Sequence, residues 1–413
     1  MQSKKEDTLN SQQVQAFVLK FLLAVLKLAA GEKGVLVEKL TLILNLLILA
    51  SAERKTINRV CKDHKKGYTG VTVRNTLKLI FSDISETERL INQLLRMTIK
   101  KEFLRGHPIL CTDLVGIGYY GTPEDPDDIR KTKKKNGTSK FYTYATVYIN
   151  MSGHRYTLAL VYVKAGEDLL TVIQRLNRYI ISYGIKPSLW LMDRGYYSVS
   201  IISWFRSYNK PFIMPTSKTG RKLDHPKGPS GTNVFQRWTR SGWSRHTLRK
   251  SARNKTDIPE TVDTDVAVVV TYPKGKGRFD SLQVLTYACW GVEHLSFPKI
   301  RKLYRTRFGI ETSYRQMNEA RAITTTKDTS LRLLFVGIAF ILRNCWIFLH
   351  FHVLYKKQTG LGGKKICLSD LTFTTMLSWL RQALETIFPL THELDVYDVS
   401  PLYAYNSSIP NRL

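Results

Sequence analysis

The feature that most constrains the fold is a change of hydrophobic period near residue 108. Residues 9–30 and 35–53 carry apolar side chains at helical spacing, and a Gly-containing break separates them. After residue 108, short apolar runs typical of strands take over. Strands are predicted at residues 109–117, 141–150, 156–164, 188–193 and 211–215, with helices at 167–183 and 198–208. The order β-β-β-α-β-α-β predicts an α/β fold, in which three antiparallel strands of a mixed sheet are followed by parallel crossovers.

This pattern divides the chain into five predicted parts. They are an all-α N-terminal region (1–105), the first part of an α/β core (106–216), a β-rich insertion (217–292), the second part of the core (293–357), and a C-terminal helix with a tail (358–413). The insertion begins basic and rich in Gly and Pro, and residues 262–273 and 281–290 predict a hairpin.

Three local predictions complete this picture. Residues 56–79 are compatible with a helix-turn-helix that contacts DNA, although short helices around a Gly turn also pack simply against their neighbours. Residues 84–101 predict a helix that begins with a capping box from Ser85 to Glu88. Residues 118–140 predict a long polar loop, which is a functional or a disordered feature in most domains.

The charge of the chain indicates a polyanionic partner. There are 63 Lys and Arg against 33 Asp and Glu, a formal net charge of +30. Such an excess favours nucleic acid, with a membrane surface as the competing partner. Residues 40–52 are too short to span a bilayer, and two arginines interrupt the apolar run 331–355, so both predict buried core helices and no membrane partner.

Location follows from the N-terminus and the cysteines. The first residues lack the apolar core and cleavage site of a signal peptide. The five cysteines lie far apart, which predicts neither a zinc site nor a disulfide framework. A reducing cytoplasm is therefore expected.

Three acids stand out from this background. Asp113 lies inside an apolar strand, and Asp193 ends the strand LWLMD. Because strand ends at a switch point of an open sheet line the functional crevice, and because the first and fourth strands are plausible parallel neighbours, we expect these two acids to lie close together. Glu311 belongs to residues 296–320, which predict one helix. One face of that helix carries Tyr304, Arg307, Glu311, Tyr314, Arg315 and Asn318.

Clustered carboxylates repel one another unless cations neutralise them. Oxygen ligands of this kind suit Mg²⁺ or Mn²⁺, and two such ions activate a water or a 3′-hydroxyl and stabilise the leaving oxygen of a phosphodiester. Taken singly, each acid is more often a turn or capping residue. The combination of strand-end positions, a third acid on a returning helix and a basic chain predicts a two-metal site for Mg²⁺ or Mn²⁺.

At this point the chain resembles a known family. The segments CTDLVGIGYYG, LWLMDRGYYS and YRTRFGIETSYRQ are similar to the three acid motifs of DDE transposases of prokaryotic insertion sequences. One branch, which has a β-strand insertion, carries a Tyr-x2-Arg-x3-Glu-x6-Lys signature. Tyr304, Arg307 and Glu311 match it, whereas Asn318 occupies the Lys position. The resemblance covers roughly residues 108–345 and implies a ribonuclease-H-like core in which Asp113, Asp193 and Glu311 are catalytic metal ligands.

The resemblance also implies contacts with DNA. Tyr304 and Arg307 are expected to position the end DNA, with helix packing and an ion pair to Glu311 as the alternatives. Further candidate DNA contacts are Arg315, Arg194, Tyr197, Lys133, Lys134 and Lys135. Trp238 and Trp243 lie among arginines and are candidates to hold a flipped or single-stranded base, or else to form the core of the β-rich insertion.

The sequence therefore predicts a transposase in the cytoplasm of a prokaryotic cell, associated with the nucleoid. It would bind terminal inverted repeats, cleave DNA at the element ends and transfer the 3′-hydroxyls into target DNA. Because two ends must be held together, at least a homodimer on DNA is implied. Two alternatives stay open: a host-adapted nuclease with the same core, and a DNA-binding protein without catalytic activity.

Overall fold

A computed structural model describes residues 8–64, 68–99, 104, 107–151, 154–250, 260–272, 282–357 and 364–390. The N-terminal region is helical, as predicted. Its helices are α1 (Ser11–Glu32), α2 (Val37–Glu53), α3 (Ile57–Asp63), α4 (Gly70–Ile80) and α5 (Ile84–Met97). Helices α3 and α4 form the candidate helix-turn-helix, whose contact with DNA stays a prediction. Two of the basic side chains at its start, Lys55 and Arg59, pair with Asp63.

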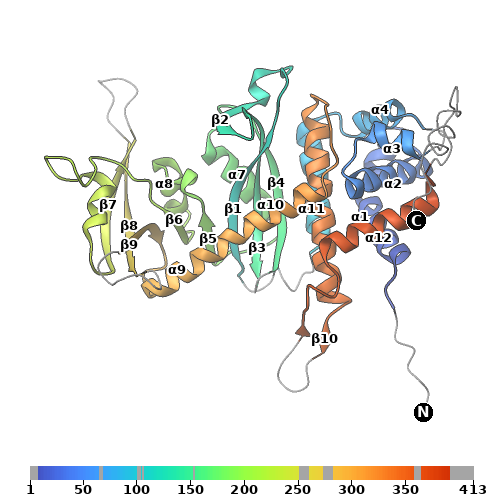
Figure 1. The fold of residues 1–413 in the computed structure, drawn as a ribbon. Coiled ribbons are helices and arrows are strands. Elements are labelled where there is room, and N and C mark those ends of the chain that lie inside the picture. The colour runs from blue at the N-terminus through green and yellow to red at the C-terminus, as the bar shows by residue number, and fades with distance from the viewer. Residues whose placement is uncertain are drawn as a thin grey trace, which may run out of the picture.

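The centre of the molecule is a mixed nine-stranded sheet (Figure 1). Its strands are β1 (Ile109–Gly118), β2 (Arg130–Lys135), β3 (Thr138–Met151), β4 (His154–Val163), β5 (Leu189–Met192), β6 (Phe212–Pro215), β7 (Gly242–Arg249), β8 (Thr261–Thr271) and β9 (Gln283–Trp290). The order is β2-β3-β1-β5-β6-β9-β8-β7, and β4 also pairs with β3. Strands β1 and β5 are parallel neighbours, which confirms the predicted pairing.

One expectation needs correction. Residues 118–140 are not simply a loop, because they contain a 3₁₀ turn (Pro126–Asp128) and strand β2, which pairs with β3. Strands β8 and β9 pair antiparallel, as predicted. They continue the central sheet, since β9 also pairs with β6. The predicted domain boundaries themselves stay predictions.

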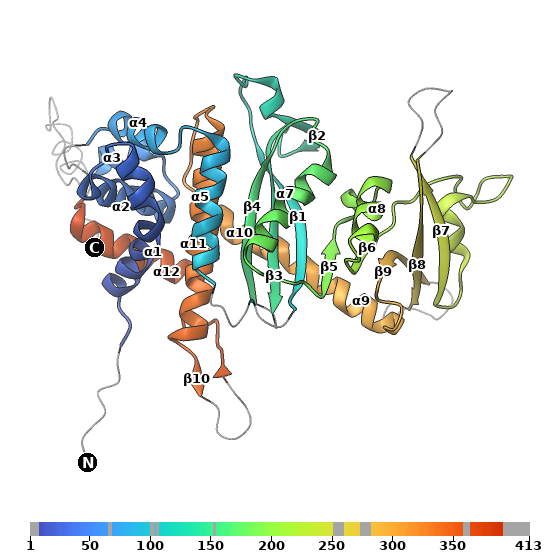
Figure 2. The ribbon, with the colours of Figure 1, turned by 180° about the vertical axis from the view of Figure 1, so that it is seen from behind.

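Helices cover both faces of the sheet. Helix α9 (Phe297–Arg305) and helix α10 (Gly309–Glu319) cross one face, whereas α7 (Leu169–Ser182) and α8 (Val199–Ser207) lie on the other (Figures 1 and 2). Helix α11 (Thr329–His352) and α5 lie side by side against β4, and α12 (Phe373–Ile387) packs on α1 and α2 (Figure 2). A short two-stranded ladder pairs β10 (Lys356–Lys357) with β11 (Lys364–Lys365).

Two helices of the described chain, α1 and α11, are long and apolar enough to cross a membrane by length and composition alone. In α11 the apolar window is 94% buried inside the protein. This agrees with the predicted core helix, because even Arg332 and Arg343 are buried within it.

Buried amides attach the helices to the outer edge of β4. Asn92 of α5 donates to the carbonyl oxygen of Leu160 and accepts from its N–H, at 2.8 Å each. Asn344 of α11 does the same for Thr157, accepting at 2.9 Å and donating at 2.8 Å. An uncovered strand edge would leave these backbone groups without partners, which is costly in a buried place. The two asparagines therefore take the place of a further strand.

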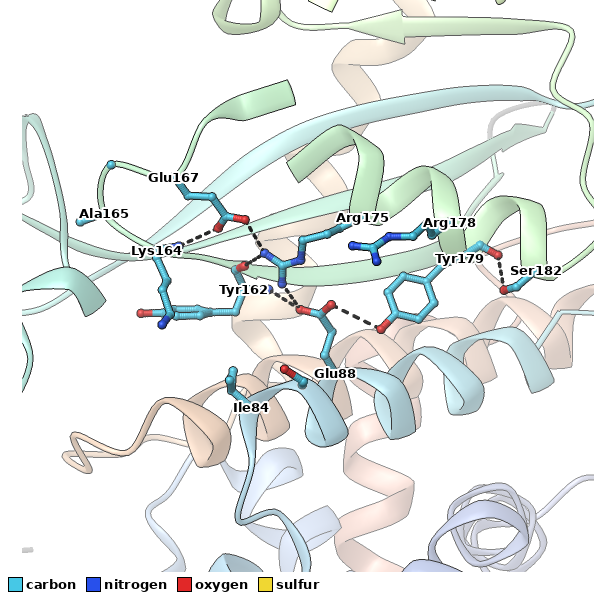
Figure 3. A pocket seen from close by; sticks show the side chains of 12 residues that line it. Ile84, Glu88, Tyr162, Lys164, Ala165, Glu167, Arg175, Arg178, Tyr179 and Ser182 are labelled. Carbon is cyan, nitrogen blue, oxygen red and sulfur yellow. Dashed lines mark hydrogen bonds and ion pairs between the residues drawn. The ribbon is translucent and has the colours of Figure 1, made fainter. Parts of the chain in front are cut away.

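Glu88 of α5 continues this attachment (Figure 3). Its carboxylate accepts from the Tyr162 N–H of β4 at 3.2 Å and from Arg175 of α7 at 2.5 Å. Arg175 also donates to Glu167 at 2.7 Å. Burial raises the pKa of Glu88, although Arg175 opposes the shift. These residues line a cavity of about 890 Å³ between α5 and α7, which contains none of the predicted site residues.

The predicted capping box at Ser85 is therefore wrong. The N-cap of α5 is Asp83, whose side chain accepts from the N–H of Glu86 at 2.8 Å. Glu88 is only 5% exposed and points toward β4 and α7, where it pairs with the cation of Arg175 instead of capping its own helix. Tertiary packing has overridden the local signal.

Glu88→Ala should destabilise the protein by about 3 kcal/mol or more, because removing one partner of a buried ion pair leaves the other uncompensated. Glu86→Ala is the matched control on the same helix, since Glu86 forms an exposed pair with Arg89 and should cost at most about 1 kcal/mol. Urea unfolding of both variants measures the difference. Equal losses would show that Glu88 does not hold α5 to the sheet.

Candidate active site

The two aspartates lie at corresponding positions of neighbouring parallel strands. Thr112 of β1 is in register with Met192 of β5, and the next residues along the two strands are Asp113 and Asp193. Strand β5 is buried at every position, so its first polar side chain comes where the strand ends. There Asp193 caps a 3₁₀ turn, Arg194–Tyr196. These two acids were expected to lie close together because their strands would be parallel neighbours, and the structure has this parallel pairing.

One guanidinium group joins the two acids. Arg307 donates from one terminal nitrogen to Asp113 Oδ2 and from the other to Asp193 Oδ1, both at 2.9 Å. Its Nε donates to the hydroxyl of Tyr304 at 3.1 Å. The residue is only 5% exposed, so it makes these contacts largely away from water. The sequence offered an ion pair with Glu311 as the alternative role of Arg307; among the described residues Arg307 pairs instead with the two aspartates.

The charges of this group depend on one another. Burial raises the pKa of Asp113, against the attraction of Arg307. Burial alone would lower the pKa of Arg307, but the interactions with Tyr304 and the two aspartates outweigh it and hold that pKa above its usual value. Because a buried charge is costly without a partner, the cation and the two carboxylates stabilise one another.

The helix that carries Arg307 differs from its prediction. Residues 296–320 do not form one regular helix, because the 3₁₀ segment Thr306–Phe308 separates α9 from α10. Strand β3 contacts this segment: the Tyr148 hydroxyl donates to the carbonyl oxygen of Arg307 at 2.7 Å, and Asn150 donates to the Thr306 hydroxyl at 2.5 Å. A mid-helix 3₁₀ stretch often marks a functional hinge.

A third contact of β3 fixes α10. The hydroxyls of Thr146 and Tyr314 are hydrogen-bonded at 2.8 Å. Thr146 is paired across the ladder with Asp113, so this bond lies beside the first acid. Residues 146, 148 and 150 alternate along one face of the strand. That face therefore holds both halves of the helical segment at a fixed place over the acids.

The third predicted acid stands apart. Glu311 lies in the first turn of α10 and is exposed. Among the described residues it forms no ion pair, and no group of three or more His, Cys, Asp or Glu side chains gathers as a metal site. Asp113 and Asp193 nevertheless fit a Mg²⁺ or Mn²⁺ site, because they supply oxygen ligands and already share one cation.

A basic cavity of about 870 Å³ adjoins the acids. Its charged lining consists of one carboxylate, Asp193, and the cations Arg194, Lys218, Arg301, Arg305 and Arg307. Tyr304 and Phe308 add aromatic surface. Lys218, Arg301 and Arg305 were not predicted as site residues. The helical spacing of residues 301, 305 and 308 is the signal that could have found two of them.

The other predicted DNA contacts are distributed over several places. Arg194 and Arg315 are exposed, and Lys133, Lys134 and Lys135 are exposed on β2. Tyr197 is only 9% exposed, and its contact with DNA stays a prediction. Asn318, at the position of the signature lysine, is partly buried on α10.

The two tryptophans pack against apolar side chains, which the sequence offered as the alternative to base binding. Trp238 contacts Phe235 beneath β8, and the Trp243 ring lies 5.6 Å from that of Phe297 in the apolar cluster under α9. These ring contacts connect the hydrophobic surfaces of β7, β8 and α9. Both side chains therefore contribute to the packing of this end of the sheet, and base binding by either of them stays a prediction.

The fold and site define a mixed α/β protein with two acids at matching positions of adjoining parallel strands and a basic cavity beside them. A family model described as "Transposase DDE domain" matches residues 105–344, more than half of the chain, and the chain belongs to this family. No curated protein matches the chain. A solved structure of piggyBac transposase, in a synaptic complex with hairpin DNA, is similar with a TM-score of 0.51 and 10% identity. The likeness covers 97% of this chain and 86% of that chain, and it shows the fold alone.

Tyr314→Phe should destabilise the protein by about 1–2 kcal/mol, because the hydroxyl of Thr146, which is 1% exposed, loses its buried partner. Tyr120→Phe is the control: its hydroxyl also makes a hydrogen bond, to the carbonyl oxygen of Asn136, but Tyr120 is 72% exposed and water replaces the lost bond. Thermal and urea unfolding compare the two. A loss no larger than that of the control would separate α10 from this anchor.

Proposed function

We propose that the chain is a transposase of an insertion sequence, which binds terminal inverted repeats, cleaves DNA at the element ends and joins the 3′-hydroxyls to target DNA. The observation that carries the proposal is the pair Asp113 and Asp193, joined by Arg307 on adjoining parallel strands in a chain of this family. The core would be ribonuclease-H-like, with the β-strands of residues 217–292 as an insertion.

In this proposal Asp113, Asp193 and Glu311 hold two Mg²⁺ or Mn²⁺ ions. The chemistry that these ions supply when bound is activation of the attacking water or 3′-hydroxyl and stabilisation of the leaving oxygen. Glu311 lies four residues after Arg307 on the same helical segment. For all three acids to hold the ions, α10 would have to move so that Glu311 approaches the aspartates, against the hydrogen bond that joins Tyr314 to Thr146. The parallel pairing of β1 with β5 would keep the two aspartates in place during that movement.

The DNA would lie along the basic cavity. Four cations line this cavity together with Asp193: Arg194, Lys218, Arg301 and Arg305. Their charges would neutralise phosphates next to the scissile bond. Tyr304 and Arg307 would position the end DNA, and Lys133, Lys134, Lys135 and Arg315 would extend the basic surface. We infer a homodimer on DNA, since two element ends must be processed together, in the cytoplasm of a prokaryotic cell.

The catalytic assignment predicts that Asp193→Asn lowers the rate of end cleavage at least about a hundredfold, since even groups that only orient metal ligands cost 10- to 100-fold when removed. The measurement uses purified protein, Mg²⁺ and a duplex carrying the inverted repeat that flanks the coding region. Asp168→Asn is the control, because Asp168 is an exposed acid that makes no capping hydrogen bond. Asp113→Asn should behave like Asp193→Asn. Full cleavage by either variant would refute the assignment, and cleavage without joined products would favour a nuclease.

DNA binding should weaken steeply with salt, because each neutralised phosphate contributes about 0.9 to the slope of log affinity against log salt. Arg305→Gln should lower the magnitude of that slope by about one unit if Arg305 contacts a phosphate. Arg381→Gln, on the surface of α12 and paired with Glu385, should leave it unchanged. Fluorescence anisotropy over a salt series measures both slopes. An unchanged slope for Arg305→Gln would place the DNA outside this cavity.

A further inference from the structure

Arg307 occupies the position between Asp113 and Asp193 that a shared cation would take. Its two terminal nitrogens each lie 2.9 Å from one carboxylate oxygen, and its Nε is satisfied by Tyr304. The guanidinium also lies 5.6 Å from the ring centroid of Tyr304 and 5.3 Å from that of Phe308. The side chain is thus fully engaged in one arrangement, with both aspartates as its counter-ions.

This arrangement competes with metal binding. A carboxylate oxygen that accepts from a guanidinium has part of its charge neutralised, and a divalent ion placed on the same oxygens would meet a like charge in a poorly hydrated place. Asp113 is the more affected partner, because its side chain is 19% exposed against 42% for Asp193. Metal entry therefore requires the guanidinium to leave.

The surroundings offer the guanidinium a second partner. Arg307 lines the basic cavity together with four other cations, so phosphates of DNA bound there would come within reach of its side chain. A guanidinium binds phosphate as well as carboxylate by paired hydrogen bonds. The 3₁₀ segment Thr306–Phe308 gives the backbone a place to adjust, and it is followed at once by Gly309 and by the turn that carries Glu311.

We infer that Arg307 is an exchangeable counter-ion, which holds the aspartates together before DNA binds and moves to a DNA phosphate when metal enters. The inference rests on the proposed function and adds to it a coupling between metal binding and DNA binding. Metal and DNA would each raise the affinity for the other, because both favour the state in which Arg307 has left the acids. Cleavage competence would then arise only on DNA.

The test measures Mn²⁺ binding directly, by the loss of the electron paramagnetic resonance signal of free Mn²⁺, with and without the flanking-repeat duplex. Without DNA, Arg307→Gln should bind Mn²⁺ about ten- to a hundredfold more tightly than the parent, the usual range for coupled sites. The parent should gain a similar factor when the duplex is added, whereas the variant should gain little. Lys299→Gln removes one exposed cation of α9 and should match the parent.

The double variant Asp113→Asn/Asp193→Asn separates the two ideas and corrects for Mn²⁺ held by the duplex. If it binds as much Mn²⁺ as the parent, the aspartates are not the ligands and the proposed function fails. If binding needs the aspartates but Arg307→Gln is no tighter than the parent, only the exchange is wrong. Circular dichroism checks that Arg307→Gln folds. If it does not fold, the inference is tested on the parent protein alone: equal Mn²⁺ affinity with and without DNA would overturn it.

Discussion

Two carboxylates at matching positions of adjoining parallel strands repel each other, and the centre of this protein depends on the cation that lies between them. Arg307 makes an ion pair of 2.9 Å with each of Asp113 and Asp193. The register of β1 with β5 brings the acids together, and the helical segment brings the cation. Neither element alone is a stable arrangement of charges, so the sheet and the segment depend on each other.

The position of Arg307 is set by the backbone beneath it. Strand β3 presents Thr146, Tyr148 and Asn150 on one face, and each makes a hydrogen bond to a different part of the segment above. The bond from Tyr148 reaches the carbonyl oxygen of Arg307 itself. These hydrogen bonds add to the apolar cluster that joins α9 and α10 to the sheet, and they set the position of the segment along β3.

The strands and the two aspartates could be predicted because their signals are local. Apolar runs bounded by turns indicated β1 and β5, and the acids interrupt or end those runs. The partner of Arg307 could not be predicted, since helical spacing favours Glu311 one turn away over two residues more than a hundred positions distant. Glu88 shows the same limit: its spacing from Ser85 is that of a capping box, but burial against Arg175 and β4 decides its role. The 3₁₀ segment Thr306–Phe308 likewise contacts Tyr148, a residue far away in the sequence that no local pattern connects to it.

The end of the sheet at β2 has a consequence for assembly. Its sequence is RKTKKK, and all but the first of these side chains are exposed along the outermost strand. A copy of the same strand could not add to this margin without bringing two rows of like charge face to face. Two molecules holding a pair of DNA ends would therefore not pair their sheets at β2, which leaves this edge open to polyanions.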